Sequence, residues 1–173
     1  MNENLEHGFV ADTLFDDRRL RALTIVDNFT RECLGIEVGQ SLKGDDVVRV
    51  LECITYARGR PAVIKVDNGS EFISKVMDRW AYENDVELDF SRPGKPTDNA
   101  KIESFNGRLR QECLNAHWFL SLEDAKAKIE AWRTHYNEER PHTSLGWLTP
   151  AEFARNCRKN VRAVTTPKSE NST

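Results

Sequence analysis

The stretch from Val63 to Gln111 decides the fold. It contains VIKVDNGSEF at 63–72 and SRPGKPTDNAKIESFNGRLRQ at 91–111. The apolar run that opens the first segment predicts a buried strand, and Asp67 follows that run directly, at a turn signal. In the second segment we expect a helix to start near 97–99, because Thr, Asp and Asn are favoured N-caps, and Glu103 lies early in that helix.

Asp67 and Glu103 are carboxylates at the end of a strand and on the helix that follows. Such a pair can converge on one divalent cation, and hard oxygen ligands suit Mg²⁺. Two such ions can stabilise the attacking and the leaving oxygen of a phosphodiester. Residue types alone leave a simpler interpretation open, in which Asp67 is a turn residue and Glu103 is solvated.

Composition indicates one folded domain with an ordinary core. The chain has 173 residues, of which 39% are hydrophobic and 31% charged, and a net charge of −3. That charge argues against a generic cationic coat for nucleic acid, although basic residues gather in 91–110. The four cysteines are widely spaced, which predicts neither zinc nor disulfides and fits a reduced cytoplasmic setting. No apolar run is long enough to span a membrane, and no signal peptide is visible.

The order of predicted elements is three strands, then a helix, a strand, a helix and a strand, followed by helices. The strands are expected at 8–13, 20–29, 33–38, 62–67 and 86–90, and the helices at 41–57, 70–83, from 97–99 to 114, 121–139 and 150–156. This order predicts an α/β fold with a mixed five-stranded sheet, three antiparallel strands then two parallel, and helices on both faces. Residues 1–157 form the predicted domain, and 158–173 a disordered polar tail.

Five motifs taken together resemble bacterial insertion-sequence transposases. They are VDNFTREC at 26–33, VDNGSEF at 66–72, PGKPTDNA at 93–100, IESFNG at 102–107, and YN at 136–137 with RPH at 140–142 and TP at 149–150. Those transposases are DDE enzymes of the retroviral-integrase type with a ribonuclease-H-like core. The resemblance covers nearly everything from Phe9 to about Ala154.

The resemblance implies DNA transposition and integration by metal-dependent phosphodiester cleavage and strand transfer. It implies that Asp67 and Glu103 bind Mg²⁺, with Mn²⁺ as an alternative, and act as catalytic residues. The implied partners are transposon-end and target DNA and a second copy of the chain in a homodimer. The expected DNA-binding residues are Arg92, Lys95, Asn99, Lys101 and Arg108.

One departure from the family pattern concerns the first catalytic Asp, whose position falls on Gly8. Asp12 shares the strand face of Gly8 but lies about 13 Å along it, at 3.3 Å per residue, too far to bind the same metal. Glu6 shares the face two residues away and is the better substitute. We therefore expect little or no strand transfer by this chain alone. Its start close to the first predicted strand suggests a truncated product, a degenerate copy or an excised domain.

Two alternatives come from other functional classes. A non-catalytic regulator could keep the fold and bind DNA or a full-length transposase. A ribonuclease-H-type hydrolase would cleave RNA–DNA hybrids, although the motif at 102–107 argues against it. Simpler roles are expected for other conspicuous residues: Asp27 in a turn, His142 as a packed or capping residue, and the four tryptophans in a core or interface.

Overall fold

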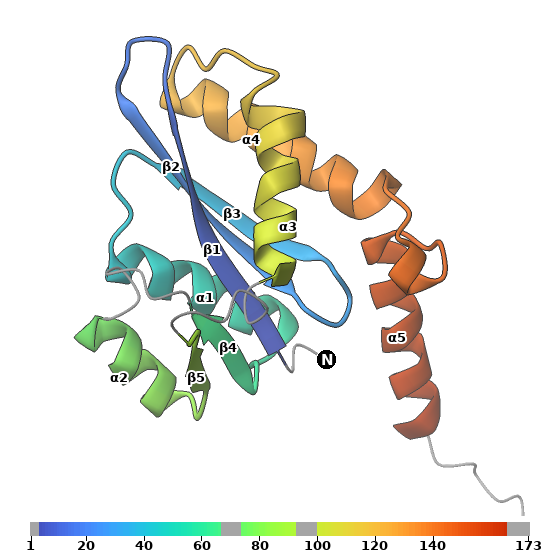
Figure 1. The fold of residues 1–173 in the computed structure, drawn as a ribbon. Helices are drawn as coiled ribbons and strands as arrows, with labels where there is room; N and C mark the ends of the chain where they lie inside the picture. The colour runs from blue at the N-terminus through green and yellow to red at the C-terminus, as the bar shows by residue number, and fades with distance from the viewer. Residues whose placement is uncertain (1–3, 67–73, 93–99, 166–173) are drawn as a thin grey trace, which may run out of the picture.

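The computed structural model describes residues 4–66, 74–92 and 100–165, with side chains described up to residue 160 (Figure 1). Its centre is a five-stranded sheet in the order β3-β2-β1-β4-β5. Strands β1 (Asn4–Thr13), β2 (Arg19–Asp27) and β3 (Cys33–Gly39) pair antiparallel. Strands β4 (Val63–Val66) and β5 (Glu87–Phe90) join in parallel on the other side of β1. The predicted mixed sheet is confirmed.

Strand β1 is the central strand, and it starts four residues earlier than predicted. Leu5 packs with the cluster that contains α1 and α2 residues, whereas Val10 packs with the cluster of α3, η2 and α4. Because side chains alternate along a strand, Glu6, Gly8 and Val10 share the second face. Both faces are covered, so β2 is buried along nearly all of its length.

Helices cover the two faces of the sheet, as predicted. Helices α1 (Gly44–Arg58) and α2 (Lys75–Glu83) pack on one face through Val47, Leu51 and Met77. Helix α3 (Ala100–Leu109), the π-helical turn η2 (Arg110–Leu114) and α4 (Leu122–Glu139) lie over the other face (Figure 1). This places α3 directly across β1 and β2.

Local sequence explains where α4 begins and ends. The Ser121 hydroxyl accepts a hydrogen bond from the Asp124 N–H, and the Asp124 carboxylate accepts one from the Leu120 N–H, which closes a reciprocal cap. The helix ends at Glu139 because the following residue precedes Pro141.

The C-terminal part differs from the prediction. After the short 3₁₀ turn η3 (Thr143–Leu145), helix α5 runs from Pro150 to Thr165 instead of ending at Asn156. Residues 158–165, predicted as part of a disordered tail, are therefore helical. The prediction stopped at polar residues, but polar positions on one side of an amphipathic helix do not end it.

The tryptophans, expected in a core or an interface, differ in burial. Trp80 is buried, but Trp118 and Trp147 are 75% and 72% exposed. Among the described helices, none is long and apolar enough to cross a membrane.

Candidate functional site

Glu103 is exposed on α3, while three neighbours on that helix are buried. Ile102, Phe105 and Leu109 recur at helical spacing, and they pack against the sheet and α4. Their burial fixes the rotation of α3, and this leaves the Glu103 carboxylate in solvent beside the sheet. A solvent-facing carboxylate on a fixed helix can bind a cation without first breaking a buried contact.

Asp67, Lys95 and Asn99 lie outside the described residues, so their predicted roles stay predictions. The described part of β4 ends at Val66, the residue before Asp67 in the sequence. In the parallel register between β1 and β4, Glu6 lies opposite Lys65.

Gly8 on β1 lies against α3. A Cβ atom added at residue 8 would lie 2.7 Å from Asn106 Nδ2 and 3.0 Å from Ile102 Cγ1. The Thr24 hydroxyl donates to Asn106 Oδ1 at 2.7 Å and lies 3.1 Å from the Gly8 carbonyl oxygen. The space for a side chain at residue 8 is therefore filled by the amide of Asn106.

Glu6 is buried beneath the start of α3, and its side chain is only 1% exposed. Burial raises the pKa of its carboxyl group, against the lowering effects of Lys65, Lys101, Arg31 and the Ile102 N–H, which donates to it. Its Oε2 atom has no hydrogen-bond donor among the described residues. A carboxyl group that is buried beneath a helix, with its pKa raised by that burial, is poorly suited to bind a cation that must exchange with solvent.

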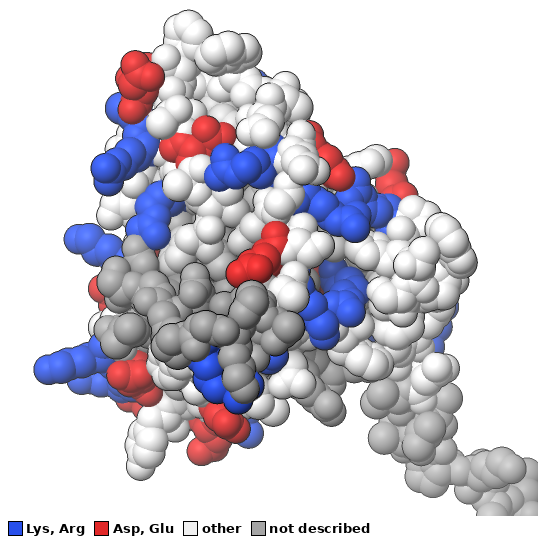
Figure 2. Space-filling view, in the orientation of Figure 1, with Lys and Arg blue, Asp and Glu red and all other residues white. Residues whose placement is uncertain are grey.

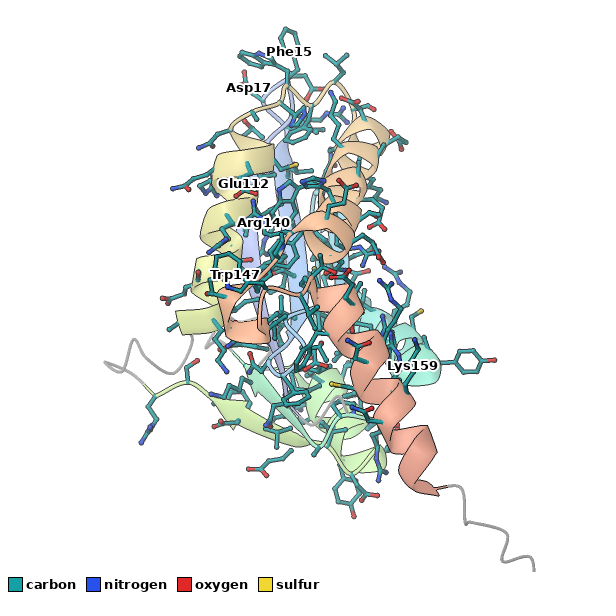
Figure 3. The ribbon with its side chains drawn as sticks, turned by 90° about the vertical axis from the view of Figure 1, so that its right-hand side faces the viewer. Phe15, Asp17, Glu112, Arg140, Trp147 and Lys159 are labelled. Atoms are coloured by element: carbon teal, nitrogen blue, oxygen red, sulfur yellow. The ribbon has the colours of Figure 1, made fainter. Side chains whose placement is uncertain are left out.

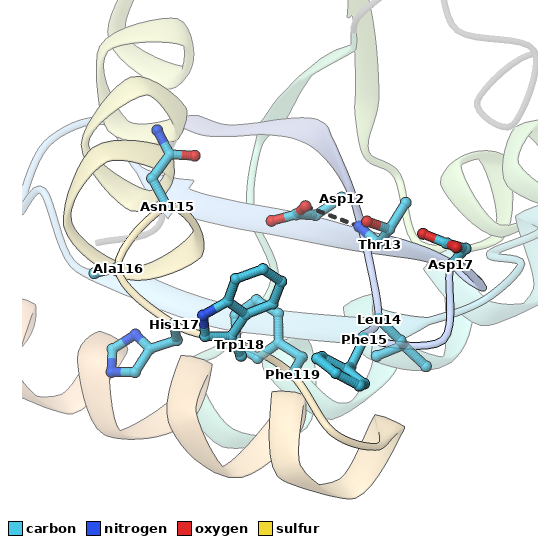
Figure 4. Close-up of a pocket in the computed structure, with 10 residues that line it drawn as sticks. All are labelled: Asp12, Thr13, Leu14, Phe15, Asp17, Asn115, Ala116, His117, Trp118 and Phe119. Carbon is cyan, nitrogen blue, oxygen red and sulfur yellow. Dashed lines mark hydrogen bonds between the residues drawn. The ribbon is translucent and has the colours of Figure 1, made fainter.

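Two other acidic residues have local roles. Asp27 Oδ1 accepts hydrogen bonds from the N–H groups of Phe29 and Thr30, which confirms it as a turn residue. Asp12 Oδ1 accepts a hydrogen bond from the Thr13 N–H, and Asp12 lines a cavity at the β1–β2 tip (Figure 4). In that cavity the Phe15 and Trp118 rings meet edge to face at 5.7 Å.

Basic residues gather on the side of α3 toward the α4–α5 connection (Figure 2). Lys101 and Arg108, both predicted to contact DNA, are exposed there, and both line a cavity of about 270 Å³. Arg31 and His142 line the same cavity. Sequence reasoning did not assign Arg31 to DNA, and it gave His142 a packing role. Arg92, also predicted for DNA, is exposed after β5.

His142 has the packed role predicted for it. Its ring meets the Tyr136 ring edge to face at a centroid distance of 5.3 Å, and its backbone pairs with Leu148. Burial and the positive charges of Arg108, Arg140 and Arg31 lower the pKa of its imidazole.

The described residues provide only some of the ligands that a metal ion would need. They contain no group of three His, Cys, Asp or Glu side chains that could hold one. Glu103 offers an exposed carboxylate, Glu6 a buried one, and residue 8 none. The described part of the chain alone does not form a Mg²⁺ site, since that ion requires near-octahedral oxygen ligands.

The fold is an α/β core in which α3 crosses a mixed five-stranded sheet, and comparisons with known proteins identify the family. A family model described as integrase core domain matches residues 2–96, and a second model with the same description matches 84–150. The chain belongs to the integrase core domain family, in the form found in bacterial insertion-sequence transposases.

Individual relatives agree with this assignment. The chain is 49% identical over 153 residues to a protein of insertion element IS407 from Burkholderia multivorans, covering 88% of this chain and 55% of that protein. It is 46% identical over 157 residues to a protein of insertion element IS476 from Xanthomonas euvesicatoria, covering 91% and 45%. The chain thus spans about half the length of these relatives.

The fold is also that of solved retroviral cores. The HTLV-2 integrase catalytic core domain in complex with magnesium aligns with a TM-score of 0.66 at 14% identity, covering 88% of this chain and 95% of that chain. At this identity the likeness concerns the fold alone. The ribonuclease-H-like prediction is confirmed.

Proposed function

We propose that this chain is the DNA-handling core of an insertion-sequence transposase, with Asp67 and Glu103 as ligands of Mg²⁺ or Mn²⁺. The observation that carries the proposal is the family match, together with Glu103 exposed on a helix fixed across β1. DNA is the proposed substrate and a second copy of the chain the proposed partner. The cytoplasm is the proposed location. The regulator alternative gains no separate support.

We further propose that the chain by itself has little or no strand-transfer activity. Gly8 provides no carboxylate, and Asn106 occupies the adjoining space. Glu6 does not replace it, because its carboxyl group is buried under α3 and this burial raises its pKa. A site that lacks one member of a catalytic set loses most of the activity of the set.

The test is a nicking and joining assay on a supercoiled plasmid and a duplex with a recessed 3′ end, in Mg²⁺ and in Mn²⁺. Gly8→Asp and the double variant Gly8→Asp/Asn106→Ser are compared with the unchanged chain. We expect at least one of them to exceed the unchanged chain by on the order of 100-fold. Adding Glu103→Gln should abolish the gain.

Strand transfer by the unchanged chain at a rate equal to that of an active Gly8 variant would contradict the low-activity proposal. Metal binding gives a second measurement, by calorimetric titration with Mn²⁺. Glu103→Gln should weaken binding, whereas Glu123→Gln, an exposed change on α4, should leave it unchanged.

A further inference from the structure

A cavity of about 270 Å³ lies on one flank of α3, and we call it the α3 flank pocket. Three segments far apart in the sequence form it. The turn between β2 and β3 contributes Arg31, α3 contributes Lys101, Ser104 and Arg108, and the segment after α4 contributes His142 and Ser144.

Three aromatic rings in edge-to-face contact form the floor of the pocket. The Phe105 and Tyr136 rings meet edge to face at 5.0 Å, and Tyr136 meets His142 at 5.3 Å. The segment after α4 is held in place by hydrogen bonds from the His142 N–H to the Leu148 carbonyl and from the Trp147 N–H to the His142 carbonyl. These contacts join α3, α4 and the segment after α4 at the floor of the pocket.

The rim of the pocket carries three positively charged side chains, Arg31, Lys101 and Arg108. In the part of the chain that the structure describes, Arg31, Lys101 and Arg108 form no ion pair, whereas the neighbouring Arg140 pairs with Glu112 (Figure 3). Concentrated positive charge of this kind favours an anion.

The pocket and Glu103 occupy different flanks of the same helix. At 100° per residue, Lys101, Ser104 and Arg108 fall on one flank, and Glu103 falls with Asn106 on the other. A helix with its side chains is about 10–12 Å across. At 3.4 Å per nucleotide along one DNA strand, about three nucleotides span that width. One strand can therefore reach both the pocket and Glu103.

We propose that the α3 flank pocket binds a backbone phosphate of a DNA strand through Arg31, Lys101 and Arg108, with the Ser104 and Ser144 hydroxyls as further donors. Lys101 and Arg108 were expected to contact DNA; the pocket adds Arg31 and Ser144 and joins them into one site. This inference rests on the proposed function, whose DNA substrate it places on the chain.

The experiment measures binding of labelled 20-nucleotide single-stranded and duplex DNA by fluorescence anisotropy, in EDTA, at several salt concentrations. Arg31→Gln and Arg108→Gln are compared with Arg79→Gln, which removes an equal charge from the exposed side of α2 on the opposite face of the sheet. Arg108→Lys tests whether charge restores binding, and thermal unfolding confirms that each variant is folded.

The pocket variants should each weaken binding about tenfold and lower the slope of log K against log salt by about one. Arg79→Gln should stay within about twofold, and Arg108→Lys should recover part of the loss. If wild-type chain binds DNA and the pocket variants behave like Arg79→Gln, the pocket assignment fails and the proposed function stands.

If wild-type chain binds neither DNA at low salt, the pocket assignment fails together with the DNA substrate of the proposed function. Titration of the chain–DNA complex with inorganic phosphate tests whether the pocket prefers a DNA backbone phosphate or free phosphate. If phosphate displaces the labelled DNA no better than another salt at the same ionic strength, the result supports a DNA site. Displacement at low millimolar phosphate that Arg108→Gln abolishes, with DNA affinity unchanged in that variant, would assign a free-phosphate site and overturn the inference.

Because EDTA removes divalent metal, these outcomes do not depend on Asp67, Glu103 or catalysis. Loss of strand-transfer activity in the assay of the Gly8 variants would therefore leave the pocket result intact.

Discussion

Residue 8 illustrates how a single side chain is excluded by its neighbour. Asn106 Nδ2 would lie 2.7 Å from a Cβ atom at that residue, closer than real Cβ contacts, and the Asn106 amide is held by the Thr24 hydroxyl. An aspartate can enter only if the amide of Asn106 moves and its hydrogen bond breaks. Glycine is therefore the residue that the present packing accommodates.

We predict that Gly8→Asp lowers the free energy of unfolding by about 1–3 kcal/mol, because it overpacks the contact with α3. Asn106→Ser alone should cost about 0.5–1.5 kcal/mol, through loss of the Thr24 hydrogen bond. The loss of unfolding free energy in the double variant should be smaller than the sum of the two single losses by at least about 0.5 kcal/mol. Urea unfolding of all four chains measures this coupling, and additive losses would show that Asn106 does not compete for the space.

Helix α3 is positioned by a buried acid as well as by its apolar side. The Glu6 carboxyl group accepts a hydrogen bond from the Ile102 N–H in the first turn of α3, where carboxylates interact favourably with the helix dipole. Burial nevertheless outweighs this and the nearby cations, so the pKa of Glu6 is raised. The carboxyl group thus connects β1 to the helix that carries Glu103.

The pH dependence of this element follows from the direction of the Glu6 shift. A raised pKa means that ionisation of Glu6 costs stability, and this cost is absent below the ordinary glutamate pKa of about 4.3 and grows as pH rises through the folded pKa. We predict that Glu6→Gln gains stability relative to the unchanged chain between pH 4 and pH 7.5. Urea unfolding at several pH values measures the difference.

Glu103→Gln is the control, because it changes an exposed carboxylate on α3 and should alter the free energy of unfolding little at either pH. A Glu6→Gln difference that stays constant or falls with rising pH would contradict the role assigned to burial.

At the scale of the whole molecule, the side chain of Glu32 connects three parts that are distant in sequence. Glu32 lies just before β3, is 4% exposed and accepts two hydrogen bonds from the Arg58 guanidinium at the end of α1, at 3.0 and 3.1 Å. Arg158 of α5 lies 4.0 Å from the same carboxylate. The Phe29 and Phe153 rings, 5.5 Å apart, add an apolar contact between the β2–β3 turn and α5.

We predict that Glu32→Gln lowers the free energy of unfolding by about 1–3 kcal/mol, because it replaces a buried carboxylate that accepts two charge-assisted hydrogen bonds from Arg58 with a neutral amide. Limited proteolysis should also cut within α5 sooner, since Arg158 loses its contact. Glu138→Gln is the matched control. It breaks the exposed pair with Arg155 and should cost less than about 1 kcal/mol. Equal losses in the two variants would show that burial of Glu32 does not strengthen the connection.

The order of strands and helices was predictable because it depends on local periodicity. The strand expected at 33–38 and the helix expected at 121–139 were read from short segments and correspond to β3 and α4. Element ends were less predictable: β1 begins earlier than expected and α5 continues to Thr165. Tertiary pairing extends a strand, and amphipathic spacing extends a helix, beyond what a short polar run suggests.

The sequence by itself determined the fold class, the family and the candidate acids Asp67 and Glu103, because these depend on spacing along the chain. Only the tertiary structure decided that Asn106 fills the space beside Gly8, that Glu6 is buried under α3, and that Arg31, Arg108 and His142 meet in one pocket. Such contacts follow from strand register and from the rotation of α3 on the sheet. Packing between distant segments sets both, and no local pattern of residues encodes them.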